Sequence, residues 1–168
     1  MNNLYVIKDD SNLQSMKNAY KKRRLIIDFN VLMNDFDSQN VTIEADWIEW
    51  LKQTSLQLLK QSPNPVLYIC SYVAGVYHPI AHDLYNVAFL TLWREFNDKQ
   101  KETLINQIQR PIKSLMKPRL VLQTILNLHE FIELDENKNK IFDEKTLAEI
   151  AENCNAYAKA LYYWEKEF

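Results

Sequence analysis

Glycine is almost absent from this sequence. Only one of the 168 residues, Gly75, is glycine. Tight β-hairpins and phosphate-cradling loops depend on glycine for positive φ angles or for close approach of the backbone. The scarcity therefore argues against a β-sandwich, a Rossmann unit or a P-loop and favours an all-α fold. The chain is long enough for one domain, or a piece of one, with a substantial core.

Other features that mark particular protein classes are missing as well. No apolar run approaches the ~18 residues of a transmembrane helix, and the start, MNNLYVIKDD, is too polar for a signal peptide. The net charge of −2 gives no overall attraction to nucleic acid or to membrane lipids. Cys70 and Cys154 lie among apolar helical positions, which favours buried thiols over a disulfide. We therefore expect a cytosolic or nuclear protein with neither nucleic acid partners nor membrane insertion.

What is present is a series of amphipathic segments, of which residues 41–65, VTIEADWIEWLKQTSLQLLKQSPNP, are the clearest. Thr42 is the predicted N-cap of a helix over 43–61, and the prolines at 63 and 65 end it. Two indoles on one helical stripe are typical of core or helix–helix packing rather than of chemistry. The stripe consists of Ile43, Trp47, Trp50, Leu51, Thr54 and Leu58.

The rest of the chain predicts further helices joined by short connections. Residues 1–40 form a poorly defined N-terminal segment, 41–134 read as HEAT-like repeats, and 135–143 as a polar loop. Antiparallel helices in units of about 40 residues suit a HEAT- or TPR-like solenoid. Leu104 and Ile108 should face inward, and Pro111 and Pro118 should bracket a linker. The predicted helices after the first are 65–77, 79–96, one from Asn97 or Asp98, 119–133 and 144–168.

The predicted last helix, 144–168, has no stop signal, because no glycine, asparagine or proline follows its final turn. We therefore expect the chain to be cut within a longer helical array whose next helix covers the exposed stripe. The stripe consists of Leu147, Ile150, Cys154, Tyr157, Leu161, Trp164 and Phe168. The residues that we single out for packing or interfaces are Trp47, Trp50, Trp93, Tyr157, Leu161, Trp164 and Phe168.

Candidate metal sites are weak. His78 and His82 have the i, i+4 spacing that can hold zinc on a helix, but no third ligand has a defined spacing. We interpret them as a helix-boundary and a surface residue. The segment from Asp135 resembles an EF-hand loop, yet Lys140 stands where the turn needs glycine and Thr146 where glutamate belongs. Its candidate ligands would be Asp135, Asn137, Asn139 and Asp143.

Two other short motifs are also discounted. The basic run YKKRRL, residues 20–25, could contact phosphate or an import receptor, but such runs are common in linkers. Asp28 in IDFNV is faintly like the DFG motif of kinases. Asn30 replaces its glycine, and neither an HRD-type motif nor a Gly-rich loop is present. We therefore assign no catalytic, cofactor-binding or metal-binding residue.

Two long stretches resemble a known family. FDSQNVTIEADWIEWLKQTSLQLLKQSPNPVL and YHPIAHDLYNVAFLTLWREFNDKQKETLINQI closely resemble the TOR (target of rapamycin) kinases where the HEAT solenoid meets the FAT region. LNLHEFIE (126–133) and CNAYAKALYYWEKEF (154–168) look like the next blocks in the same order. The resemblance covers most of residues 35–168. Residues 1–33 have no match, and the connections 111–123 and 135–150 depart from the family pattern.

The resemblance implies that the parent is a very large phosphatidylinositol-3-kinase-related kinase that phosphorylates serine and threonine in proteins, in nutrient and growth signalling. Its ATP and Mg²⁺ site would lie beyond Phe168, so no site residue carries over. The implied role here is an armadillo-type frame, with 144–168 as the first helix of the FAT-like array. Implied partners are the remaining repeats, the kinase domain and raptor-type or other TOR-complex subunits, in the cytoplasm, the nucleus or on the cytosolic face of endomembranes.

Two other functions stay open. A free-standing helical-repeat adaptor could bind a protein partner on its concave face, if the chain is a complete product. An all-α enzyme or metal protein could use His78, His82 and nearby carboxylates. Defined zinc stoichiometry would favour the metal protein, and an open reading frame that continues past Phe168 would favour the kinase segment.

Overall fold

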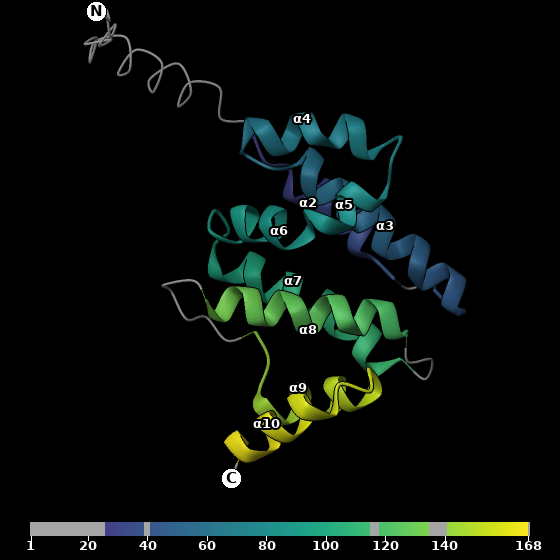
Figure 1. Cartoon of the computed structure of the whole chain (residues 1–168). Helices are drawn as coiled ribbons and strands as arrows, with labels where there is room; N and C mark the ends of the chain where they lie inside the picture. The colour runs from purple at the N-terminus through teal and green to yellow at the C-terminus, as the bar shows by residue number, and fades with distance from the viewer. Residues whose placement is uncertain (1–25, 39–40, 115–117, 135–140, 168) are drawn as a thin grey trace, which may run out of the picture.

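The computed structural model describes residues 26–38, 41–114, 118–134 and 141–167. Within these ranges all regular secondary structure is α-helical, which confirms the predicted all-α fold. The helices, labelled as in Figure 1, are α2 (Phe29–Phe36), α3 (Glu44–Lys60), α4 (Pro65–Ala74), α5 (Pro79–Asp83), α6 (Tyr85–Trp93), α7 (Asp98–Lys113), α8 (Arg119–Glu133), α9 (Glu144–Asn153) and α10 (Tyr157–Glu167).

The helices form a stack (Figure 1). Helix α4 lies at one end, α2, α3 and α5 lie next to it, α6 to α8 follow, and α9 and α10 close the other end. Most helices pack on neighbours in the chain, as in a helical-repeat protein. Helix α3 contacts α2, α4, α5, α6 and α8 and so spans several layers, and α2–α7 and α6–α8 contacts also join helices that are not neighbours in the chain.

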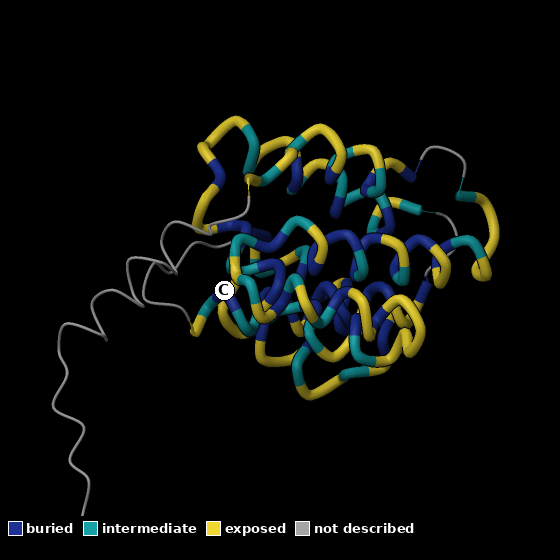
Figure 2. Tube along the Cα trace, turned by 90° about the horizontal axis from the view of Figure 1, so that it is seen from above, coloured by how far each residue is buried: buried dark blue, intermediate teal, exposed yellow. Residues whose placement is uncertain are grey.

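A single hydrophobic core runs through the stack (Figure 2). Its buried residues extend from Leu32 and Phe36 on α2 to Ala160 and Tyr163 on α10. Leu104 and Ile108 on α7 are fully buried, as the sequence predicts. On α8 the predicted stripe Val121, Ile125, Leu128 and Ile132 is buried as well.

The start of α3 differs from the sequence prediction. The helix begins at Glu44 with Ile43 as its N-cap, so the assignment of Thr42 as N-cap is wrong. The carboxylate of Asp46 reaches back and accepts hydrogen bonds from the backbone N–H groups of Thr42 and Ile43, each 3.1 Å long. The Thr42 hydroxyl donates to the same carboxylate at 3.3 Å.

The predicted helix 79–96 is in fact two helices. Helix α5 ends at Asp83 and α6 begins at Tyr85, with Leu84 between them at φ −91° and ψ 0°. This segment is apolar on most sides, so its periodicity does not show the bend. The bend lets α5 pack on α3 and α4 while α6 packs on α3 and α8.

Pro111 does not begin a linker. Helix α7 continues through it to Lys113, and the ring is buried. A proline so close to the C-terminal end removes only one N–H bond, and burial of its ring offsets part of that loss. The connection to α8 therefore spans only residues 114–118.

The predicted helix 144–168 is also two helices. Asn155 adopts φ 60° and the N–H of Ala156 donates to the carbonyl of Ala151 at 2.8 Å, which ends α9. Asparagine is one of the few residues that tolerate this conformation, so the stop signal was present inside the predicted helix. Helix α10 folds back and packs mainly on α9.

Candidate functional site

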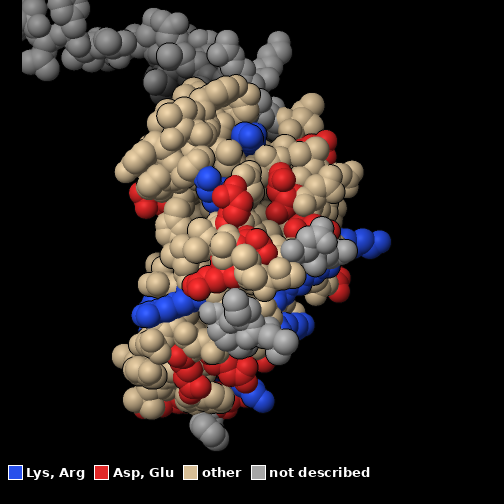
Figure 3. All heavy atoms as spheres, turned by 90° about the vertical axis from the view of Figure 1, so that its right-hand side faces the viewer, with Lys and Arg blue, Asp and Glu red and all other residues tan. Residues whose placement is uncertain are grey.

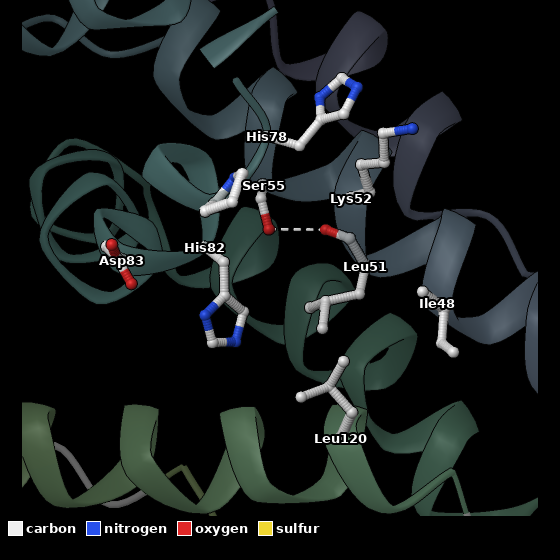
Figure 4. Close-up of a pocket in the computed structure, with 9 residues that line it drawn as sticks. Ile48, Leu51, Lys52, Ser55, His78, His82, Asp83 and Leu120 are labelled. Atoms are coloured by element: carbon white, nitrogen blue, oxygen red, sulfur yellow. Dashed lines mark hydrogen bonds between the residues drawn. The ribbon is translucent and has the colours of Figure 1, made fainter. Parts of the chain in front are cut away.

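An apolar groove of about 390 Å³ lies between α3, α5 and α8 (Figure 4). Helix α3 contributes positions three and four apart, which share one face of the helix. Pro79 is the first residue of α5. His78 is the N-cap of this helix, and His82 lies within it. The lining consists of Ile48, Leu51, Lys52, Ser55, His78, Pro79, His82, Asp83 and Leu120.

The polar groups of the groove mostly bond to the protein itself. The Ser55 hydroxyl donates to the Leu51 carbonyl at 2.6 Å (Figure 4). The Thr124 hydroxyl donates to the Leu120 carbonyl, so it accepts from His82 Nε2 at 3.2 Å, which assigns the proton to that nitrogen. These bonds leave an apolar floor that suits a hydrophobic side chain better than a reacting group.

The two histidines do not form a metal site. His78 Nδ1 donates to the Ala74 carbonyl at 3.1 Å, and the imidazoles of His78 and His82 point away from each other in Figure 4. No group of three His, Cys, Asp or Glu side chains in the described ranges is placed to hold a metal ion. The structure thus gives the zinc hypothesis no geometric support.

One carboxylate beside the groove is held in its charged form. Glu49 accepts from Gln53 at 2.6 Å and pairs with Lys52 at 3.3 Å. The Gln53 hydrogen bond, with smaller contributions from Lys52 and His78, lowers the pKa of Glu49. Glu49 and Lys52 at this edge are therefore already paired with each other.

Other polar residues singled out in the sequence have structural positions. Asp28 caps α2 and accepts from the N–H groups of Asn30 and Val31 at 3.1 Å. Asp143 caps α9 and accepts from the Thr146 N–H at 3.2 Å. The basic run 20–25 and the loop residues 135–140 lie outside the described residues.

The three tryptophans singled out before residue 100 are buried. Trp47 and Trp50 meet edge to face at 5.6 Å, and Trp50 Nε1 donates to the Phe36 carbonyl at 3.3 Å, which ties α3 to α2. Trp93 stacks on Phe89 at 5.7 Å.

The predicted C-terminal interface residues are less buried. Tyr157 and Leu161 are exposed by 69% and 61%, whereas Trp164 is half-buried and donates to Glu152 at 2.8 Å. Phe168 lies outside the described residues. A covering helix over Tyr157 and Leu161 stays a prediction.

Sequence reasoning missed two features. One is the outer side of α4 and its C-terminal turn, where six large apolar residues are exposed. Residues 61–82 contain no Lys, Arg, Asp or Glu, and Figure 3 shows a largely uncharged area at this end of the molecule. The lack of charge was readable in the sequence, but the exposure was not. The six are Val66, Ile69, Tyr72, Val73, Val76 and Tyr77.

The second missed feature is His129. It lies on the buried face of α8, and its side chain is only 1% exposed. The only signal was its position one residue after Leu128 in the apolar stripe.

No described helix is long and apolar enough to cross a membrane.

Comparison with known proteins finds similar sequences of one kind. The chain is 37% identical over 145 residues to the serine/threonine-protein kinase tor1 of Schizosaccharomyces pombe and, equally, to TOR2 of Saccharomyces cerevisiae. It is 40% identical over 123 residues to mTor of Drosophila melanogaster. The matches cover 86%, 86% and 73% of this chain but only 6%, 6% and 5% of those kinases. No protein-family profile matches.

Proposed function

The chain belongs to the TOR family of serine/threonine-protein kinases, as a short segment of their length, and we propose that it is a non-catalytic α-solenoid scaffold. The observation that carries this proposal is a match along 86% of the chain to two kinases of which it covers only 6%. Within that segment the described helices form a stack with a continuous core. A stack of this kind suits a frame that holds other parts in place.

The kinase activity is proposed for the parent protein. It phosphorylates serine and threonine of protein substrates in nutrient and growth signalling, and its ATP and Mg²⁺ are held outside this segment. The partners of the segment are the remaining helical repeats, the kinase domain and raptor-type or other TOR-complex subunits. The segment itself belongs to the junction of HEAT repeats and FAT region, in the cytoplasm, the nucleus or on the cytosolic face of endomembranes.

A chimera tests this scaffold role. The matched stretch of S. cerevisiae TOR2 is replaced by the corresponding residues of this chain, and the chimera is purified from cells without intact TOR2. We expect it to keep its kinase activity and its bound subunits. The control carries Leu128→Pro, which places proline in the middle of α8 at a fully buried position, and it should lose both.

Two results would contradict the proposal. One is a chimera that folds and accumulates normally but has lost activity and subunits, because a scaffold of the same family should support them. The other is ATP-dependent phosphorylation of protein by the isolated chain, because that would place a catalytic site within it.

The groove between α3, α5 and α8 favours the second candidate, a free-standing adaptor that binds a protein partner. Sequencing the transcript past Phe168 separates the two functions. Continuation into further helical repeats and a kinase domain supports the scaffold. A stop codon directly after Phe168 in a stable transcript supports the adaptor.

A further inference from the structure

His129 is enclosed where α8 meets the last two helices. Its ring centroid lies 6.2 Å from that of Phe142, which precedes α9, and 6.4 Å from that of Tyr163 on α10. Neither Nδ1 nor Nε2 has a hydrogen-bond partner among the described residues. A buried imidazole of this kind is unusual, because buried polar side chains are nearly always hydrogen-bonded.

Charged groups from all three helices surround this ring. On α8, Glu133 places Oε1 3.5 Å from His129 Nε2, which is longer than an ordinary hydrogen bond. Glu130 on the same helix is paired with Lys159 of α10 at 2.7 Å. From α9, Glu144 adds a third carboxylate whose charge acts on the imidazole.

Two further groups of α10 complete this environment. The phenol of Tyr163 is 2% exposed, and its pKa is raised by burial and by Glu130 and Glu133. The pKa of Lys166 is raised by its contact with the Tyr162 hydroxyl and, more weakly, by Glu133 and Glu144. The carboxylates near the ring therefore also act on cations of α10.

Burial opposes the charged form of His129. An imidazolium would lose its hydration without gaining a short hydrogen bond in return. Burial lowers the pKa of His129, and the nearby carboxylates, Glu133 first, offset only part of that effect. The packed joint thus holds a neutral ring between α8, Phe142 and Tyr163.

We propose that His129 makes the contact between α8 and the α9–α10 pair sensitive to protons, so that protonation of its buried ring opens this joint. When α9 and α10 move away from α8, the ring gains water and can take up a proton. Acidification therefore favours the open arrangement. Among the described residues of α2 to α6, the histidine that contacts α8 is His82, which is exposed rather than buried.

The sign and size follow from linkage. The ring in the packed joint has a pKa below the value of about 6.5 of an unperturbed histidine, which applies to the open joint. Stability from the neutral ring is present above that value and is lost as pH falls toward the pKa of the packed state. Between the two values the opening equilibrium constant rises by up to about tenfold per pH unit.

Hydrogen–deuterium exchange of the full chain at pH 7.5, 6.5 and 5.5, corrected for the intrinsic pH dependence of exchange, tests the proposal. Peptides from α9 and α10 should open up to about fivefold more at pH 5.5 than at 6.5, because the open joint titrates at about 6.5. Peptides from α3 should change far less. His129→Leu introduces an apolar side chain of similar size and should abolish the extra opening of α9 and α10 at low pH. His78→Gln, at an exposed histidine outside the joint, is the matched control and should preserve it.

An unchanged pH response of α9 and α10 in His129→Leu would overturn the proposal. If that variant does not fold, His129→Gln and a direct NMR titration of the His129 ring in the unaltered chain decide the matter. A ring that titrates above about 6.5 would overturn the proposal, because protonation would then stabilise the packed joint. A ring that stays neutral well below that value, together with opening of α9 and α10, supports it.

Discussion

Replacing Trp50 by phenylalanine should destabilise the chain more than the same replacement at Trp47, although both indoles are buried on α3. Trp50 Nε1 donates to the Phe36 carbonyl at 3.3 Å. Trp47 Nε1 is buried with no hydrogen-bond partner among the described residues. The two substitutions therefore remove similar apolar surface. Trp50→Phe also breaks a hydrogen bond, whereas Trp47→Phe removes a buried donor that makes none.

The expected difference in free energy of unfolding is about 1–3 kcal/mol. Loss of the Trp50 bond costs about 0.5–1.5 kcal/mol and leaves the Phe36 carbonyl without this donor. Removal of the unpartnered Trp47 donor returns part of a desolvation cost of about 1–3 kcal/mol. Phenylalanine can keep the edge-to-face contacts with Phe36 and with the neighbouring indole, 5.9 and 5.6 Å between centroids, so these largely cancel.

Urea unfolding followed by far-UV circular dichroism measures this difference, since fluorescence would change with the tryptophans themselves. The m-value should stay constant while the midpoint falls further for Trp50→Phe. Trp93→Phe is the control, because Trp93 Nε1 is likewise buried without a hydrogen-bond partner in the described part of the chain, and it should behave like Trp47→Phe. The reasoning is refuted if Trp47→Phe costs as much as Trp50→Phe or more.

Three further outcomes are expected. Asn97→Ala should cost about 1 kcal/mol of stability in thermal melts, because it removes the capping bond of α7 to Gln100 at 2.9 Å; an unchanged melting temperature would show that the cap contributes nothing. Asn155→Ala should cost about 1 kcal/mol and Asn155→Gly almost nothing, since φ is 60°; equal losses would contradict the role of backbone strain. The pKa of Asp46 is lowered by hydrogen bonds from the N–H groups of Thr42 and Ile43. The stabilisation from its carboxylate is therefore present above about pH 4 and is lost as pH falls through the lowered pKa. Asp46→Asn should flatten this acid limb of a curve of stability against pH.

Much of the fold was predictable because the spacing of the apolar residues and the capping residues at the helix ends agree. Helix α8 begins and ends where its stripe predicts, at Arg119 and Glu133, since Pro118 precedes it and the sequence after it is polar. The start of α7 was equally clear, because Asn97 and Gln100 form a capping box. In these two segments the apolar spacing and the residues at the helix ends predict the same helix, and tertiary packing does not change it.

The errors arose where local chemistry competed with periodicity. Leu84 and Asn155 interrupt segments whose apolar spacing continues across the break, so a single stripe concealed two helices in each case. Pro111 was taken as a stop, although a buried proline near a helix end is tolerated.

The candidate sites were less predictable than the fold. The groove depends on the crossing of α3, α5 and α8, and the burial of His129 depends on α10 folding back, and neither can be read from residue spacing. Sequence reasoning discounted His78 and His82 as ligands from the missing third partner. It could not foresee that Thr124, 42 positions further along, bonds His82.

The contact between α2 and α7 sets a delay in the folding of the early layers during synthesis. Asp37 at the end of α2 pairs with Arg110 of α7 at 2.6 Å across 73 positions of the chain. A ribosome adds about 5–20 residues per second, so roughly 4–15 s separate the two partners. During this interval the faces of α2 and α3 that later meet α7 and α8 remain open to water. Helices α9 and α10, which pack mainly on each other, pair almost as soon as they emerge. Helices α2 and α3 thus wait much longer for their partners than α9 and α10 do, and they are the part of the nascent segment that most needs protection from premature association.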